Sequence, residues 1–190
     1  MTIGFALCGS FCTYSQIFPI LEELAAKHTV IPIFSAASAS TDSRFGKSSE
    51  FRERAQRICG MQPLSGLAQV EPIGPRKLLD ILVIAPCTGN TLAKLAHSIA
   101  DGPVTMAAKS HLRNGRPIVL AVSTNDALAG AAENIGKLLS RKHYYFVPFR
   151  QDAWEKKPTS LVAEFTLIPQ TVEMAMEGNQ IQPLLLAGKP

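Results

Sequence analysis

The chain has 190 residues, 46% of them hydrophobic and 18% charged, which is enough for one domain with a complete core and too little for two large ones. The net charge of +4 does not indicate a nucleic-acid partner, because Lys and Arg are spread along the chain without an aromatic-rich basic stripe. No apolar run reaches the length of about 18 residues that crosses a bilayer, and no basic segment precedes the apolar residues 3–7. We therefore predict a single cytoplasmic domain over residues 1–190 that binds neither nucleic acid nor a membrane.

The four cysteines do not predict a metal site. They lack the paired C-x-x-C spacing with histidine partners that zinc sites use, and they are Cys8, Cys12, Cys59 and Cys87. Reduced thiols in a reducing compartment are expected instead. Cys12 and Cys87 are expected to pack as small apolar side chains, and Cys12 is alternatively placed near a helix start, where a thiolate is favoured.

Strand-like and helix-like segments alternate in the first half of the chain. An apolar strand is predicted over residues 3–8, and the helix after it has an inner face formed by Ile17, Ile20, Leu21, Leu24 and Ala25. β-Branched residues predict a second strand over residues 29–34. The charged stretch 47–59, closed by Gly60, is predicted to be an exposed helix, and a short strand is predicted at residues 67–70.

The alternation continues in the second half. Residues 81–85 are continuously apolar, as expected of a strand covered on both faces. A helix over residues 88–100 is predicted from the stripe formed by Leu92, Leu95, Ala96 and Ile99. The elements predicted after it are a turn at 114–115, a strand at 117–122, a helix at 128–139, a strand at 144–147 and a helix at 169–176. This order predicts an α/β protein with a three-layer, Rossmann-like, doubly wound parallel sheet.

Polar loops follow four of the predicted strands. In an open parallel sheet, ligands bind outside the carboxyl ends of the strands, near the point where strand order reverses. The loops at this edge are crowded with Ser, Thr, Asn and Gly, and they comprise residues 9–13, 35–41, 88–91 and 123–126. Helix capping alone does not require four such loops at one edge, so we predict a nucleotide-like cofactor there.

The first loop argues against a dinucleotide. It lacks the G-x-G-x-x-G pattern, because Gly9 is followed by Ser10 and Phe11, and the strand at 29–34 ends without the acidic residue that would bind an adenosine ribose. A mononucleotide with one phosphate needs only hydroxyls, backbone amides and a helix N-terminus. Flavin mononucleotide (FMN) fits these requirements, with hydroxyls from Ser10, Ser35, Ser38 and Thr88.

Individual side chains have alternative interpretations. Asn90 and Asn125 are placed to hydrogen-bond a flavin ring or a substrate, or to stabilise their own turns. Thr88 and Thr91 can equally cap a helix. A dianionic substrate needs planar cationic groups, for which Arg150, Arg44 and Arg113 are candidates, with Arg150 preferred because it follows the last predicted strand. No catalytic group is assigned, since the histidines fall at helix ends or on helix surfaces, at positions 28, 97, 111 and 143.

The segment Ala85-Pro86-Cys87-Thr88-Gly89-Asn90-Thr91 is the first evidence of a resemblance to a known family. This segment resembles the Pro-Ala-Ser-Ala-Asn-Thr motif of the flavoproteins that include the flavin-containing cysteine decarboxylases, and Gly9-Ser10 matches their phosphate loop. Segments over nearly the whole chain, among them Ser123-Thr124-Asn125-Asp126-Ala127-Leu128, resemble the dipicolinate synthase B subunits of spore-forming bacteria. Together, the loop chemistry and the resemblance imply an FMN site formed by Gly9, Ser10, Phe11, Ser35, Ser38, Pro86, Thr88, Asn90, Thr91, Ser123 and Asn125.

The resemblance also implies an activity and partners. It implies oxidation of a dihydrodipicolinate-type ring to pyridine-2,6-dicarboxylate during sporulation, in a homo-oligomer that works with a dipicolinate synthase A subunit carrying NADP. The sequence departs from the wider family, because residues 71–80 lack the catalytic histidine of the decarboxylases and Ser123-Thr124-Asn125 replaces their Pro-x-Met-Asn element. Phe11 stands where the B subunits are expected to have histidine. Two alternatives stay open: an FMN-dependent decarboxylase of the cysteine or pantothenate type, and a non-catalytic scaffold protein.

Overall fold

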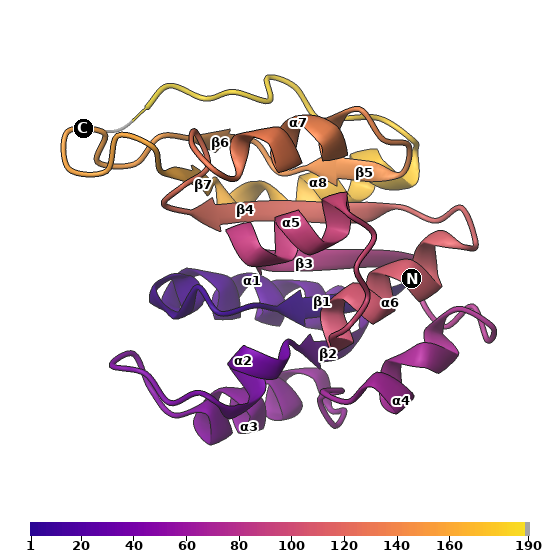
Figure 1. The fold of residues 1–190 in the computed structure, drawn as a ribbon. Helices are drawn as coiled ribbons and strands as arrows, with labels where there is room; N and C mark the ends of the chain where they lie inside the picture. The colour runs from indigo at the N-terminus through magenta and orange to yellow at the C-terminus, as the bar shows by residue number, and fades with distance from the viewer. Residues whose placement is uncertain (189–190) are drawn as a thin grey trace.

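The structure is a computed structural model that describes residues 1–188, and its centre is a mixed sheet of seven strands (Figure 1). Five strands run parallel in the spatial order β2-β1-β3-β4-β5: β1 (Thr2–Leu7), β2 (Thr29–Phe34), β3 (Ile81–Cys87), β4 (Ile118–Thr124) and β5 (Tyr144–Phe146). At the carboxyl end of β4, the antiparallel strands β7 (Leu161–Ala163) and β6 (Phe149–Arg150) extend the sheet. The doubly wound α/β fold is confirmed, with an antiparallel extension that was not predicted.

Helices cover both faces of the sheet and give three layers (Figure 1). One face is covered by α5 (Gly89–Ala96), α6 (Pro103–Leu112) and α7 (Ala132–Leu139), and the other by α1 (Tyr14–Lys27) and α8 (Ile168–Met176). The connection from β2 to β3 contains α2 (Ala36–Ser40), α3 (Ser48–Cys59), α4 (Leu67–Val70) and the 3₁₀ helix η2 (Glu71–Ile73). Two further 3₁₀ helices are η1 (Phe11–Thr13) and η3 (Phe165–Leu167). None of the helices within residues 1–188 is both long and apolar enough to cross a membrane.

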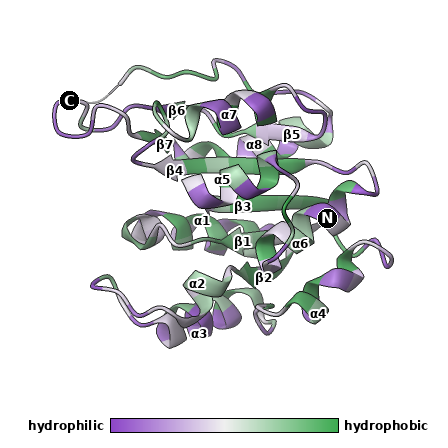
Figure 2. Cartoon of the chain, viewed as in Figure 1, coloured by the Kyte–Doolittle hydropathy of each residue, from purple (hydrophilic) through white to green (hydrophobic). Residues whose placement is uncertain are grey.

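The central strands are apolar because both of their faces are covered. Every residue of β3 is buried, and so are residues 118–123 of β4. Figure 2 shows these strands as hydrophobic, whereas α3 at the edge of the molecule carries hydrophilic residues. Parallel strands buried on both faces carry continuous apolar runs, which is why the run at 81–85 predicts β3 correctly.

Strand order reverses between β1 and β3. After β1 the chain forms β2 on one side and then returns to form β3 on the other side. At such a point the loops that follow the two neighbouring strands diverge and leave a crevice outside their carboxyl ends. The loops after β1 and β3 therefore border the site described below.

Two segments differ from the predicted secondary structure. Residues 67–70 were predicted as a strand but form α4, where the Gln69 side-chain oxygen accepts hydrogen bonds from the backbone N–H groups of Ser65 and Gly66 and closes a helical turn. The helix α6 is absent from the predicted elements. Its sequence signals are Pro103 in the first turn and a buried stripe formed by Val104, Ala107, Ala108 and His111.

The helix α5 is shorter than predicted. It ends at Ala96, where the Arg141 guanidinium donates hydrogen bonds to the carbonyl oxygens of Leu95 (3.1 Å) and Ala96 (2.7 Å). Ile99 was predicted to continue the buried stripe and is instead 47% exposed.

Two further burial predictions are wrong. Leu128 and Leu139 were expected on the buried face of one helix, but α7 begins only at Ala132 and both side chains are exposed. His111 lies near a helix end as predicted, and it is fully buried.

Candidate functional site

Two adjoining cavities lie at the carboxyl edge of the sheet. The switch-point cavity, of about 480 Å³, lies among the loops after β1, β2 and β3 and is lined by Cys8, Gly9, Ser35, Ala36, Ala37, Thr88, Asn90, Thr91, Lys94 and residues 101–105. The polar cleft, of about 590 Å³, lies between the loops after β1 and β4 and the strands β6 and β7. It is lined by Gly9, Ser10, Cys12, Thr13, Gln16, Thr88, residues 123–125, Arg150, Asp152, Lys157 and residues 160–164. Because Gly9 and Thr88 line both, two ligands bound here would be neighbours.

Helix capping occupies some of the predicted hydroxyls. Ser35 Oγ accepts a hydrogen bond from the backbone N–H of Ser38 (3.1 Å), and Thr88 Oγ1 accepts one from that of Thr91 (3.4 Å). The capping alternative is therefore correct for Thr88, although a hydroxyl oxygen has a second lone pair for a ligand. Ser38 is fully buried, donates a hydrogen bond to the carbonyl oxygen of Leu7 (2.8 Å), and does not line the cavity.

The donors of the switch-point cavity fit a phosphate monoester. Within residues 1–188, the backbone N–H groups of Gly9, Gly89 and Asn90 have no hydrogen-bond acceptor. Unpaired N–H groups at the start of a helix such as α5 bind anionic oxygen atoms. Lys94 at the same cavity is paired with Asp101 (2.8 Å), and this hydrogen bond holds the pKa of the Asp101 carboxyl below its usual value. Backbone donors therefore dominate the anion-binding part of the cavity.

Close packing around Gly89 joins two of the loops. A Cβ atom on this residue would lie 2.8 Å from both Thr124 Oγ1 and Asp126 Oδ1, in the segment that follows β4. The absence of a side chain at Gly89 lets the Thr124 and Asp126 side chains approach the start of α5 closely.

The rest of the switch-point cavity has small and neutral side chains. Ala36, Ala37 and Val104 form part of the wall. The thiol of Cys8 accepts a hydrogen bond from Thr91 Oγ1 (3.3 Å), and burial raises the pKa of Cys8 to about 11, so the thiol stays protonated near neutral pH. The cavity thus combines anion donors with an uncharged wall, which suits a phosphate attached to an apolar group.

The polar cleft contains two ion pairs. Arg150 Nη2 lies 2.6 Å from Glu164 Oε2, and Lys157 Nζ lies 3.2 Å from Asp152 Oδ2. Burial opposes ionisation of Asp152, but a hydrogen bond from Ser160 and the ammonium group of Lys157 hold its pKa below the usual value. Each cation of the cleft is therefore balanced by a carboxylate.

Hydrogen bonds between loops fix the shape of the polar cleft. The hydroxyl groups of Ser10 and Ser123 lie 2.8 Å apart and join the loops after β1 and β4. The backbone oxygen of Asn125 accepts a hydrogen bond from Thr159 (2.6 Å), and its side-chain oxygen accepts a longer one from Ser160 (3.5 Å). The Asn125 side chain lines the cleft, and its hydrogen bond goes to Ser160 and not to its own turn, so ligand binding by this residue stays a prediction.

Eight of the eleven residues predicted to bind the cofactor line one of the two cavities, namely Gly9, Ser10, Ser35, Thr88, Asn90, Thr91, Ser123 and Asn125. The other three do not. Ser38 lies behind the wall, Pro86 is buried at the end of β3, and Phe11 stacks on Phe51 with 6.4 Å between ring centroids. The packing of Phe11 among aromatic rings explains why its side chain turns away from the cavities.

One of the three predicted arginines reaches the site. Arg150 lines the polar cleft. Arg44 is exposed and lies over the ring of Phe45, 4.9 Å from its centroid, outside both cavities. Arg113 follows α6 near Gly74, at the opposite, amino-terminal edge of the sheet. Sequence spacing could not separate these arginines, because all three flank predicted elements.

Several lining residues were missed. Residues 101–105 belong to the start of the unpredicted α6, whose Gly102-Pro103 pair is a usable signal for a helix start. Asp152, Lys157 and Ser160 enter the cleft from the segment between β6 and β7, two strands that are too short to give a periodic pattern. Cys12 was expected to be buried but is exposed and lines the cleft, whereas Cys87 packs in the core as predicted.

The chemical groups available in the cleft are carboxylates, hydroxyls, an ammonium group, a guanidinium group and a thiol. No histidine within residues 1–188 lines either cavity. The site can thus hold a phosphate-bearing ligand beside a second polar ligand, without an imidazole for acid–base chemistry.

Known proteins share this architecture. The family model described as Flavoprotein matches residues 1–165. The dipicolinate synthase B subunit of Bacillus subtilis (strain 168) is 44% identical over 185 residues, which cover 97% of this chain and 92% of the relative. The crystal structure of the dipicolinate synthase B subunit from Bacillus halodurans is 42% identical, with a TM-score of 0.90 and coverage of 99% of this chain and 97% of that one. An FMN-dependent cysteine decarboxylase has the same fold at 19% identity, with a TM-score of 0.67 and coverage of 92% and 97%. The chain belongs to the flavoprotein family and, within it, to the family of dipicolinate synthase B subunits.

Proposed function

We propose that the protein is the B component of a dipicolinate synthase that oxidises a dihydrodipicolinate-type ring to pyridine-2,6-dicarboxylate during sporulation. The observation that carries this proposal is the relationship to dipicolinate synthase B subunits along nearly the whole chain. The geometry supports it, because the switch-point cavity and the polar cleft meet at Gly9 and Thr88, as a cofactor and its substrate require.

FMN is the proposed ligand of the switch-point cavity. Its phosphate would accept hydrogen bonds from the backbone N–H groups of Gly9, Gly89 and Asn90, next to the start of α5. The small, uncharged wall leaves space for the ring system on the side of the polar cleft. When bound, a flavin supplies two-electron redox chemistry, and the chain supplies binding, orientation and electrostatics.

The proposed ligand of the polar cleft is the dicarboxylate substrate. Arg150 uses guanidinium N–H groups for Glu164 and for the carbonyl oxygen of Ala187 (3.5 Å), and a guanidinium has five donors in all. The unused donors are available to one substrate carboxylate, and Lys157 on the same cleft is available to the other. Both cations already have carboxylate partners, which reduces their attraction for the substrate. Hydrogen bonds from the serine hydroxyls are therefore expected to contribute as much to substrate binding as the charges of Arg150 and Lys157.

The further parts of the proposal concern the assembly. We propose a single-domain, cytoplasmic protein that forms a homo-oligomer and works with a dipicolinate synthase A subunit, which carries NADP on a nicotinamide-binding fold. No acid or base is assigned to the reaction.

Two alternatives make different predictions. A decarboxylase of the cysteine or pantothenate type is disfavoured, because no histidine within residues 1–188 lines the cavities. A non-catalytic scaffold protein is favoured by one observation, the pairing of both cleft cations with carboxylates. In a scaffold, the A subunit would perform the oxidation alone.

The experiment combines the purified chain, freed of flavin, with the A subunit, NADP and freshly prepared dihydrodipicolinate. Formation of the pyridine ring is followed by its ultraviolet absorbance, with and without added FMN. We expect product formation to require both this chain and FMN. Equal product with and without FMN would refute flavin catalysis and support the scaffold, and release of CO2 from a cysteine-containing substrate would support the decarboxylase.

A further inference from the structure

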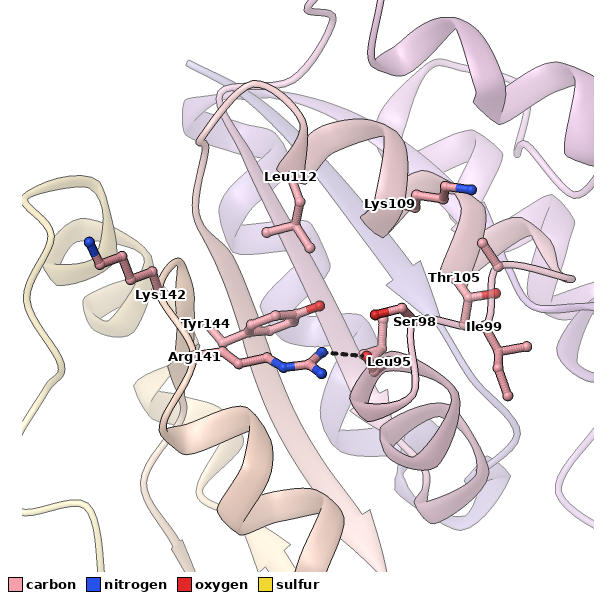
Figure 3. Close-up of a pocket in the computed structure, with 10 residues that line it drawn as sticks. Leu95, Ser98, Ile99, Thr105, Lys109, Leu112, Arg141, Lys142 and Tyr144 are labelled. Carbon is pink, nitrogen blue, oxygen red and sulfur yellow. Dashed lines mark hydrogen bonds between the residues drawn. The ribbon is translucent and has the colours of Figure 1, made fainter.

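A third cavity lies on the face of the sheet that α5, α6 and α7 cover (Figure 3). It has a volume of about 390 Å³ and is formed by the end of α5 with the loop after it, by one side of α6, and by the segment that enters β5. We call it the helix-face cavity. Thr105 is the one lining residue that it shares with the switch-point cavity, and it shares none with the polar cleft.

The walls of the helix-face cavity are largely apolar. Leu95 from α5, Leu112 from α6 and the ring of Tyr144 from β5 face the same space (Figure 3). Ile99 extends this wall and is 47% exposed. Cavities of about 300–1,000 Å³ with apolar walls and a few polar groups are typical of small-molecule sites.

The hydroxyl group of Tyr144 opens into this cavity. Most of the Tyr144 side chain is buried, and within residues 1–188 its hydroxyl group has no hydrogen-bond partner and faces the cavity. Figure 3 shows this hydroxyl directed into the cavity, on the same side as the Arg141 guanidinium and Ser98. Burial raises the pKa of Tyr144 to about 12 despite the nearby Arg141, so the hydroxyl is a hydrogen-bond donor at neutral pH. The hydroxyl can therefore donate a hydrogen bond to an anionic ligand in the cavity.

The charged groups around the cavity are all cationic. Lys109, Arg141 and Lys142 line it, no acidic residue does, and none of the three forms an ion pair within residues 1–188. Arg141 also holds the end of α5 through Leu95 and Ala96, which fixes the direction of its guanidinium. The polar cleft differs, because each of its cations has a carboxylate partner. The positive charge of the helix-face cavity is therefore not balanced by any carboxylate within residues 1–188.

We propose that the helix-face cavity binds a small aromatic carboxylate, whose ring contacts Leu95 and Leu112 and whose carboxylate accepts hydrogen bonds from Tyr144 and Arg141. A neutral aromatic compound would leave the cations unpaired, and an inorganic anion would leave the apolar walls uncovered. An aromatic carboxylate satisfies both, through charge-assisted hydrogen bonds and contact with the ring.

The probes of this site are benzoate, benzyl alcohol and inorganic phosphate. Each is titrated into the full-length chain by calorimetry, once alone and once with excess FMN. Benzoate is expected to bind saturably and with the same affinity in both cases, at least about tenfold more tightly than either benzyl alcohol or phosphate. Equal binding of phosphate and benzoate, displacement of benzoate by FMN, or no saturable binding would overturn the proposal.

Matched tyrosine variants locate the binding. Tyr144→Phe removes the hydroxyl and keeps the ring, and it is expected to weaken benzoate binding about tenfold. Tyr145→Phe is the control, because the next residue of a strand points to the opposite face and Tyr145 does not line the cavity. Lys109→Gln, at an exposed position, is expected to weaken benzoate binding severalfold even where Tyr144→Phe proves unstable. Unchanged affinity in both Tyr144→Phe and Lys109→Gln would refute the assignment.

Discussion

The buried His111 should make folding stability depend on pH. Its Nε2 atom lies 3.0 Å from the carbonyl oxygen of Pro117, which can only accept, so Nε2 carries the proton. Its Nδ1 atom is buried without a hydrogen-bond partner within residues 1–188. Protonation would place an N–H group there with no acceptor and a charge in the core. Burial lowers the pKa of His111 to about 4, and the positive charge of Arg116 adds a smaller decrease. The hydrogen bond with the Pro117 carbonyl and the negative charge of Asp80 oppose this shift.

The size of the effect follows from linkage. An unfolded histidine has a pKa of about 6.5, so between pH 6.5 and 4 the unfolded state binds the proton and the folded state does not. Stability is therefore lost as the pH falls through this window. His111 alone accounts for a loss of about 2 kcal/mol between about pH 7 and pH 5, and for about 3 kcal/mol below pH 4. In a chain of this length, a loss of 2 kcal/mol corresponds to a Tm lower by about 4–8 °C.

Urea unfolding followed by circular dichroism measures this effect at pH 7 and pH 5. His111→Gln retains a side-chain donor for the Pro117 carbonyl and removes the titrating group, so its loss of stability over this interval should be smaller by about 2 kcal/mol than that of the wild type. His97→Gln, at an exposed position, is the control and should behave as the wild type. If His111→Gln and the wild type lose the same stability between the two pH values, His111 is not held neutral and the reasoning is refuted.

Three further substitutions test packing, capping and the cleft. Gly4→Ala would place a Cβ atom 2.5 Å from Leu79 Cδ1 and should lower the free energy of unfolding by about 1–3 kcal/mol. Gly136→Ala, at a helix position with no atom near the new Cβ, should raise the free energy of unfolding by up to about 1 kcal/mol, and equal effects of the two substitutions in urea titrations would disprove the clash at Gly4. Thr88→Ala should cost about 1 kcal/mol of stability through the lost cap and weaken FMN binding, and Thr88→Ser should restore both. Arg150→Gln should weaken binding of pyridine-2,6-dicarboxylate about tenfold in calorimetry, with Arg44→Gln as the unaffected control, and unchanged binding would remove Arg150 from the proposed site.

The sequence predicts the fold well where burial on both faces produces long apolar runs. β1, β3 and β4 satisfy this condition, and the helices with clear apolar stripes follow them. Prediction from the sequence fails where contacts between distant residues determine the bounds of an element, or where an element is very short. α5 ends early because Arg141, distant in sequence, binds its last carbonyl oxygens. β6 and β7 have two and three residues, too few for any period to be seen.

The candidate site was predicted in the same uneven way. Loop residues that directly follow strands, such as Gly9, Thr88 and Asn125, were found because the carboxyl ends of parallel strands meet at one edge. Side chains that enter from the antiparallel extension, such as Asp152 and Lys157, were missed. The helix-face cavity could not be predicted at all, since its polar group, Tyr144, is defined by the absence of a partner and not by a motif.

Titration of the full-length protein with FMN, followed by flavin fluorescence, tests most directly whether the switch-point cavity binds the cofactor. Ala37 is exposed on the cavity wall, so Ala37→Trp fills part of the cavity without disturbing the core, and Ala26→Trp on the exposed side of α1 is the matched control. The wild type and Ala26→Trp should bind FMN saturably and with equal affinity, and Ala37→Trp should bind it much more weakly. Equal binding by all three proteins, or no saturable binding by the wild type, would contradict the proposed cofactor site.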